Sequence, residues 1–264
     1  MINHIDTTFH ALHSQGKKAL IAFVTAGFPT LPRSADIITC LLDNGADIVE
    51  IGIPFSDPIA DGPTIQYSSQ QALRNHASLT RLVPWMIKLG QSVQSPLVCM
   101  GYLNPFFQYG LDRLSRDLSG SINGIIVPDL PIEESKNFRA VFTRKRIHCI
   151  QLVTPVTPIK RCRTIMQSSS GFVYAVSTTG VTGARRSIAR NTVLFLEKLK
   201  KNTDLPVALG FGISKPAQVS AVRRYCDGII VGSAFINIIR DHNGSGLFTR
   251  LKKYTRSLQQ ALNP

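Results

Sequence analysis

Eight short apolar segments recur along the chain, and each is rich in Ile, Val or Leu. Each ends in, or directly precedes, Gly, Pro, Ser or Thr, which is typical of a strand that enters a loop. We therefore predict eight strands, at Ala19–Thr25, Asp47–Gly52, Pro96–Gly101, Gly124–Pro128, His148–Val153, Gly171–Ser177, Pro206–Gly210 and Asp227–Gly232.

The stretches between these segments carry apolar residues at helical spacing. The clearest examples are Arg33–Leu42, Glu133–Phe142, Ser187–Leu199 and Lys215–Val222. Strand alternating with helix eight times is typical of a (β/α)8 TIM barrel in the α/β class. No linker or low-complexity stretch interrupts this order. We predict a single barrel domain over residues 1–264, with an N-terminal helix before strand one.

A carboxylate lies in the middle of the second predicted strand. Side chains alternate across a strand, so Ile48, Glu50 and Gly52 face one way while Val49 and Ile51 face the other. Both faces are apolar enough to be buried, as in a parallel sheet covered by helices. Burial raises the pKa of a carboxyl group towards the range useful for proton transfer. A structural ion pair with a basic residue is the alternative interpretation of Glu50.

The loop after this strand is rich in Pro and Asp. It spans residues 53–63 and holds Asp57 and Asp61, whose plain interpretation is turn chemistry. The loop is too long for a simple turn, however, and it offers a second carboxylate just past the strand. Residues 178–190 form a second long loop after the sixth strand. Loops at this end of a barrel build the active site, so both are candidate lids.

Glycines end the last two predicted strands. Gly210-Phe211-Gly212 closes the seventh strand, and Gly232-Ser233 closes the eighth. Barrels frequently bind phosphate with the loops after strands seven and eight, where glycine lets backbone N–H groups approach the ligand. The alternative is that these glycines simply fit tight turns between strand and helix.

The same segments resemble one protein family. The string from Glu50 to Gln66, EIGIPFSDPIADGPTIQ, is similar to the signature of the tryptophan synthase α subunit. Further similar blocks follow in the family's order and extend the resemblance over nearly the whole chain. They are Gly101–Pro105, Val127–Pro131 with Glu133-Glu134, Ser177–Gly183, Gly210–Ser214 and Val231–Ala234.

The resemblance implies retro-aldol cleavage of indole-3-glycerol phosphate to indole and glyceraldehyde 3-phosphate. It implies that Glu50 moves protons at indole C3 and at the glycerol hydroxyl, while Asp61 binds or deprotonates the indole N–H. The catalytic residues are then Glu50 and Asp61, and the chain needs no metal and no cofactor of its own.

Further site residues follow from the same resemblance. Thr182 would orient Asp61, and Tyr174 would lie near Glu50, although an ordinary core aromatic remains the alternative for Tyr174. Phe23 and Tyr102 would line the indole pocket. The phosphate contacts would be Gly183, Phe211, Gly212, Gly232 and Ser233.

The family also implies a protein partner. This is a tryptophan synthase β subunit that carries pyridoxal phosphate and receives indole within an α2β2 heterotetramer. The contacts expected from the resemblance lie on two loops, at Pro54, Phe55, Asp57, Asn104 and Pro105. Exposed Pro and Phe on a loop suit a protein interface.

Composition narrows the remaining functions. The net charge of +14 comes from short basic clusters spread along the chain, with no nucleic-acid signature, so we expect no nucleic-acid partner. No long apolar run predicts a membrane span, and the N-terminus lacks a signal-peptide pattern. The five cysteines are widely spaced and form no CxxC pair. They indicate reduced thiols and a cytoplasmic protein.

Two alternatives remain beside the lyase. One is a regulatory binding subunit that has lost most lyase activity and serves to activate its β partner. The other is a different phosphate-binding barrel enzyme of indole or histidine biosynthesis, against which the 50–66 block argues. Indole release by the isolated chain, and then with β subunit, separates the first alternative from the lyase.

Overall fold

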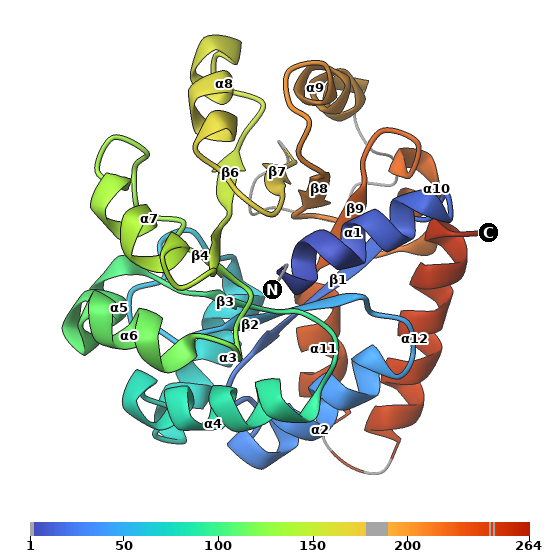
Figure 1. Ribbon diagram of the computed structural model, residues 1–264. Coiled ribbons are helices and arrows are strands. Elements are labelled where there is room, and N and C mark those ends of the chain that lie inside the picture. Colours follow the sequence, from blue (N-terminus) through green and yellow to red (C-terminus); the bar gives the residue numbers. More distant parts are fainter. Residues whose placement is uncertain (1–2, 178–189, 243, 245) are drawn as a thin grey trace.

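Parallel strands form a barrel wall in the computed structural model, which describes residues 3–177, 190–242, 244 and 246–264 (Figure 1). Nine strands are present in these ranges, in the order β5-β4-β3-β2-β1-β9-β8-β7-β6. They are β1 Ala19–Thr25, β2 Ile48–Gly52, β3 Leu97–Met100, β4 Gly124–Ile126, β5 His148–Cys149, β6 Gln151–Val153, β7 Val173–Val176, β8 Val207–Gly210 and β9 Gly228–Val231. Every observed strand lies within one of the predicted ranges, and the barrel prediction is confirmed.

The fifth predicted strand is the one that divides. Its first half, β5, pairs with β4, and its second half, β6, pairs with β7. Ile150 lies between the halves, and its N–H donates to the Ile125 carbonyl at 3.0 Å. The segment therefore changes partners at Ile150 and joins the two edges of the sheet, which closes the barrel.

Helices surround the strands on the outside (Figure 1). Helix α1, His4–Ser14, precedes β1. The others are α2 Leu31–Leu42, α3 Pro63–Arg74, α4 Leu79–Ser92, α5 Leu103–Tyr109, α6 Leu111–Leu118, α7 Lys136–Thr143, α8 Ile159–Gln167, α9 Arg190–Lys200, α10 Pro216–Val222, α11 Ser233–Asp241 and α12 Leu247–Leu262.

Helix boundaries differ from the prediction by a few residues. Helix α2 begins at Leu31 because the Thr30 hydroxyl accepts the Arg33 N–H and caps it. Helix α7 begins at Lys136 instead of residue 133, since residues 131–135 form turns after β4. Residues 187–189 of the predicted third helix lie outside the described residues.

The strands bury both of their faces, as predicted for the second strand. One set of side chains fills the barrel interior, including Ile48, Phe172 and Ile230. The alternate set, including Val49 and Ile51, packs under the surrounding helices. This double burial is the arrangement of a parallel sheet, and it leaves Glu50 on the interior face.

Helix α1 closes the amino-terminal end of the barrel. Its Ile5 and Phe9 belong to the interior cluster, and the Phe9 ring lies 5.7 Å from that of Phe172. Asn3 caps the helix by accepting the Ile5 N–H at 2.9 Å. His148, at the start of β5, contacts Asp6 at 2.9 Å and ties the helix to the wall. This end is filled with side chains, so a substrate pocket has to lie at the other end.

We expect Ile5→Ala to destabilise the protein, because Ile5 is fully buried and its removal leaves a cavity under the barrel. Truncation of this kind costs about 2–5 kcal/mol of unfolding free energy. Urea denaturation measures it. His10→Ala, at an exposed position of the same helix, is the matched control and should change stability by less than about 0.5 kcal/mol. Equal effects of the two variants would show that α1 does not plug the barrel.

Candidate active site

Glu50 lies inside the barrel on β2. It is paired in register with Phe23 of β1 and Val98 of β3, and its side chain is fully buried. Neither carboxyl oxygen has a hydrogen-bond partner among the described residues, so none of these residues holds Glu50 in a structural ion pair. Desolvation by burial raises the pKa of Glu50 to about 8. The group therefore holds its proton at neutral pH in the absence of ligand.

Asp61 lies in the loop between β2 and α3, two residues before the helix begins. Burial raises its pKa to about 6, while a hydrogen bond from the Tyr102 hydroxyl works in the opposite direction. The same hydroxyl accepts the Ala60 N–H at 2.9 Å. Tyr102 thus holds both the loop backbone and the carboxylate. At pH 7 Asp61 is mostly ionised, whereas Glu50 is mostly protonated.

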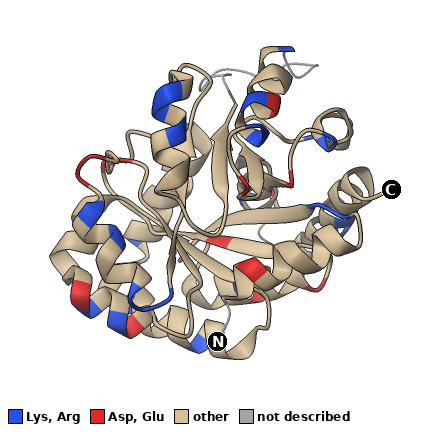
Figure 2. Ribbon diagram, turned by 45° about the horizontal axis from the view of Figure 1, so that its top comes forward, with Lys and Arg blue, Asp and Glu red and all other residues tan. Residues whose placement is uncertain are grey.

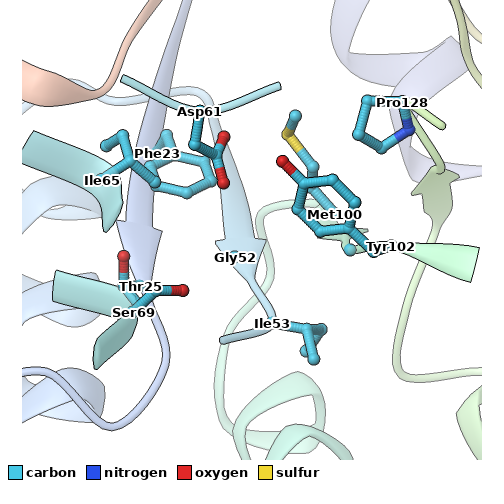
Figure 3. Close-up of a pocket in the computed structure, with 11 residues that line it drawn as sticks. Phe23, Thr25, Gly52, Ile53, Asp61, Ile65, Ser69, Met100, Tyr102 and Pro128 are labelled. Atoms are coloured by element: carbon cyan, nitrogen blue, oxygen red, sulfur yellow. The ribbon is translucent and has the colours of Figure 1, made fainter. Parts of the chain in front are cut away.

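A pocket opens at the carboxyl ends of the strands (Figure 3). It contains about 290 Å³ of space, part of which is open to solvent. Figure 3 shows the Asp61 carboxylate between the Phe23 and Tyr102 rings. The lining residues are Phe23, Thr25, Gly52, Ile53, Asp61, Ile65, Ser69, Met100, Gly101, Tyr102 and Pro128.

Three predicted site residues, Phe23, Asp61 and Tyr102, line this pocket, whereas Glu50 lies beneath it. Gly52, the next inward residue along β2, forms part of the lining between them. The sequence reasoning missed the apolar walls, including Met100 and Ile65. For Met100 a signal existed, because it continues the inward register of Val98 on β3.

Two glycines make room for aromatic rings at the pocket. A Cβ atom on Gly52 would collide with the Phe23 ring, and one on Gly210 would collide with the Tyr174 ring. Tyr174 is buried, and the charges of Glu50 and Asp61 both help to raise its pKa. It therefore lies within electrostatic reach of both carboxylates. Gly210 begins the glycine-rich segment predicted to bind phosphate, and its lack of a side chain makes space for Tyr174.

The predicted phosphate residues gather where β8 and β9 end. Phe211 and Gly212 both have positive φ, at 66° and 73°, so the chain turns sharply after β8. The Ser177 hydroxyl donates to the Phe211 carbonyl at 2.7 Å and supports this turn. Gly232 and Ser233 form the start of α11, which has no side-chain cap. The fifth predicted phosphate residue, Gly183, lies outside the described residues, as does Thr182, which was predicted to orient Asp61.

Comparison with known proteins identifies the family. The family model described as tryptophan synthase alpha chain matches residues 9–263. The alpha chain of Geotalea daltonii is 40% identical over 99% of both chains, and that of Clostridium kluyveri is 46% identical over 90% of both. The chain belongs to the tryptophan synthase alpha chain family.

Solved structures agree in fold. A structure of Mycobacterium tuberculosis tryptophan synthase matches with a TM-score of 0.91 at 32% identity and covers 100% of each chain. The tryptophan synthase alpha chain of Legionella pneumophila matches with a TM-score of 0.90 at 30% identity, and covers 100% of this chain and 98% of the other. The barrel is thus shared with family members over its whole length.

The residues expected to contact a β subunit differ in exposure in this alpha chain. Asp57 and Asn104 are exposed, Pro105 is half-buried, and Pro54 is buried. Phe55 turns inward and stacks on Tyr102, with ring centroids 5.2 Å apart. The large exposed apolar side chains on these two segments are instead Ile59 and Phe107, 84% and 68% exposed. Neither residue was predicted from the sequence, since exposure on a loop or short helix cannot be read from its sequence.

Lys, Arg, Asp and Glu residues are spread over many of the helices and loops (Figure 2). Among the described residues of this alpha chain, no group of three or more His, Cys, Asp or Glu could hold a metal ion. None of the helices within the described ranges is long and apolar enough to cross a membrane.

We expect the buried Glu50 to make stability fall as pH rises. Its pKa is 4.5 in an ordinary environment and about 8 in the folded protein, so between these values the folded state binds more protons than the unfolded state. The unfolding free energy then decreases by at most about 1.4 kcal/mol per pH unit across this window.

Urea unfolding at pH 5, 6, 7 and 8 measures the unfolding free energy of the unchanged protein and of the Glu50→Gln variant. The Gln side chain stays neutral at every pH. The Gln variant should gain stability relative to the unchanged protein as pH rises. Asp61 is present in both proteins, so its own titration cancels from the difference. Parallel pH curves would mean that Glu50 titrates normally in the folded state.

Proposed function

We propose that Glu50 and Asp61 carry out the reaction of this chain, the retro-aldol cleavage of indole-3-glycerol phosphate to indole and glyceraldehyde 3-phosphate. As a tryptophan synthase alpha chain, the protein is the lyase subunit and passes indole to a beta subunit. The observation that supports these two roles is the pair of carboxyl groups at one end of the barrel, with pKa values of about 8 and about 6. At pH 7 the first of these groups is mostly protonated and the second is mostly ionised.

Glu50 is placed to supply the proton. Protonation of indole C3 places positive charge on the ring nitrogen and weakens the bond from C3 to the carbinol carbon. When that bond breaks, its electron pair returns to the indole ring, and the carbinol becomes an aldehyde as its hydroxyl proton leaves. Glu50 gives its proton to C3 and recovers one from the hydroxyl, so it ends the cycle protonated.

Asp61 is suited to the charge that develops at nitrogen. Its carboxylate is ionised near neutral pH and faces a pocket with apolar walls, where an ionic hydrogen bond to the indole N–H is stronger than in water. Phe23 and Tyr102 flank the same pocket and provide flat surfaces for an indole ring. Tyr174 lies close to both carboxylates.

The phosphate is assigned to the ends of β8 and β9. Phe211, Gly212, Gly232 and Ser233 would bind it through backbone groups, because the start of α11 favours an anion. Gly183 would bind the phosphate as well, and Thr182 would orient Asp61; both lie outside the described residues. This arrangement would hold the glycerol end of the substrate away from the carboxyl groups that act on the indole end.

A tryptophan synthase beta subunit is the partner of this chain. We propose that the complex is an α2β2 heterotetramer, that pyridoxal phosphate lies in the β subunit, and that the protein is cytoplasmic. The exposed Ile59 and Phe107 support an interface over loop 53–62 and α5, together with Asp57, Asn104 and Pro105. Large exposed apolar side chains on neighbouring segments are typical of such surfaces.

We expect Glu50→Gln and Asp61→Asn each to reduce indole release by about 10²–10⁴-fold. Both changes keep the size of the side chain but remove its capacity to transfer a proton or carry charge. The decrease should be greater for Glu50→Gln, since Glu50 acts at two atoms. Steady-state indole release by the isolated chain, and in the presence of β subunit, gives the rates.

Substrate affinity should survive in both variants because backbone groups elsewhere hold the phosphate. Glu197→Gln, an exposed position on α9, is the control and should leave turnover unchanged. Loss of binding with turnover per bound substrate preserved would make the two carboxyl groups positioning groups. If the chain without substitutions releases no indole but activates its β partner, the result would support the regulatory alternative.

We expect Phe107→Ala to weaken β-subunit binding by about tenfold or more, the cost of removing a well-buried aromatic anchor from an interface. Titration calorimetry with purified β subunit measures it. Leu194→Ala, at a 44% exposed apolar position on α9, is the control and should not change the affinity. If both variants bind β subunit like the unchanged chain, Phe107 lies outside the interface.

A further inference from the structure

Asp129 takes no part in the chemistry proposed above, yet it makes a specific contact beside the pocket. It belongs to the Val127–Pro131 segment that follows β4. Both of its carboxyl oxygens accept the Leu103 N–H, at 3.0 and 3.3 Å. Leu103 is the first residue of α5, so the carboxylate joins the loop after β4 to the helix after β3.

Helix α5 requires this contact because its own N-cap residue supplies none. The first N–H groups of a helix have no partner within the helix, and a carboxylate satisfies them well. Tyr102 occupies the N-cap position of α5 and makes no side-chain cap. Its side chain lies in the pocket instead. Asp129 therefore holds the peptide between Tyr102 and Leu103 in place of a local cap.

Tyr102 transmits this constraint to Asp61. Its hydroxyl accepts the Ala60 N–H at 2.9 Å and also acts on the neighbouring Asp61 carboxylate, whose pKa it lowers relative to the effect of burial alone. Its ring stacks on Phe55, at the other end of the same loop. Burial and the charge of Asp61 raise the pKa of Tyr102, and the charge of Asp129 adds to the increase. The phenol therefore stays protonated and able to donate.

We propose that Asp129 is a positioning residue, which holds the start of α5 so that the Tyr102 hydroxyl stays on Asp61. This rests on the proposed function only in giving Asp61 a role in the reaction. The bonds from Leu103 to Asp129 and from Ala60 to Tyr102 lie within this chain and involve no substrate. The proposal can therefore be tested without substrate.

A matched contact exists at the opposite end of the same two strands. Asn123, just before β4, accepts the Leu97 N–H at the start of β3 at 3.0 Å. This bond has the same type and length as the first Asp129 bond, but it lies at the amino-terminal end, away from the pocket. Asn123→Ala therefore reports what the loss of such a bond does to the barrel alone.

The decisive measurement is the pKa of the Asp61 carboxyl group, followed by ¹³C NMR in the free protein. Tyr102→Phe removes the donated hydrogen bond, so the pKa of Asp61 should rise. Asp129→Ala should raise it as well, and the double variant should show no shift beyond that of Tyr102→Phe. Asn123→Ala should leave it unchanged.

The direction in which Asp129→Ala shifts the pKa of Asp61 distinguishes a positioning role of Asp129 from a direct effect of its charge. Removing the negative charge of Asp129 would by itself lower the pKa of a neighbouring carboxyl group. Glu50 and Tyr174 also lie within electrostatic reach of the site, but they are the same in every variant. A fall in the pKa of Asp61, or no change, in Asp129→Ala would overturn the proposal.

Two further results complete the test. Asp129→Asn keeps one acceptor oxygen and the fold, so it should show a smaller rise in the pKa of Asp61 than the Ala variant, and no rise would count against positioning. In the indole-release assay, Asp129→Ala should lower kcat about tenfold and change KM less than about threefold. If the protein without substitutions released no indole, the proposed function would be refuted. The NMR shifts would still decide the role of Asp129.

Discussion

The site depends on a carboxyl group that lies inside an apolar barrel and has no hydrogen-bond partner within the part of the chain that the structure describes. Glu50 lies among Ile48, Val98 and Phe172 on the interior side of the strands, and it is fully buried. The charged form would lose its hydration with nothing to replace it, so the barrel favours the neutral acid. The same burial that costs stability at alkaline pH keeps a proton available at neutral pH.

The second carboxyl group is effective because its surroundings differ. Asp61 comes from a loop instead of a strand, and the Tyr102 hydroxyl moderates the effect of burial on its pKa. The two environments hold the pKa values about two units apart, on either side of neutral pH. One type of side chain can then act as an acid at one atom and as an anion at another.

Small residues and contacts between loops shape the surroundings of these two carboxyl groups. Gly52 and Gly210 admit the rings of Phe23 and Tyr174, which a Cβ atom at either position would displace. Asp129 supplies the cap that Tyr102 cannot supply, because the Tyr102 side chain is used on Asp61. The Tyr102 side chain can therefore lie in the pocket, because the loop after β4 caps α5 in its place.

The sequence by itself determined the barrel, the inward register of Glu50 and the family. Side chains alternate between the two faces of a strand, and this alternation is a local property. Glu50, two residues after Ile48, therefore lies on the same face of β2 whatever the other strands do. Which side chains meet is not local. The bond from the Ala60 N–H to Tyr102, the cap from Asp129 to Leu103 and the change of partners at Ile150 join segments that are distant in the chain. Only the closed barrel brings the carboxyl ends of β2, β3 and β4 together, and so only the tertiary structure decided these contacts.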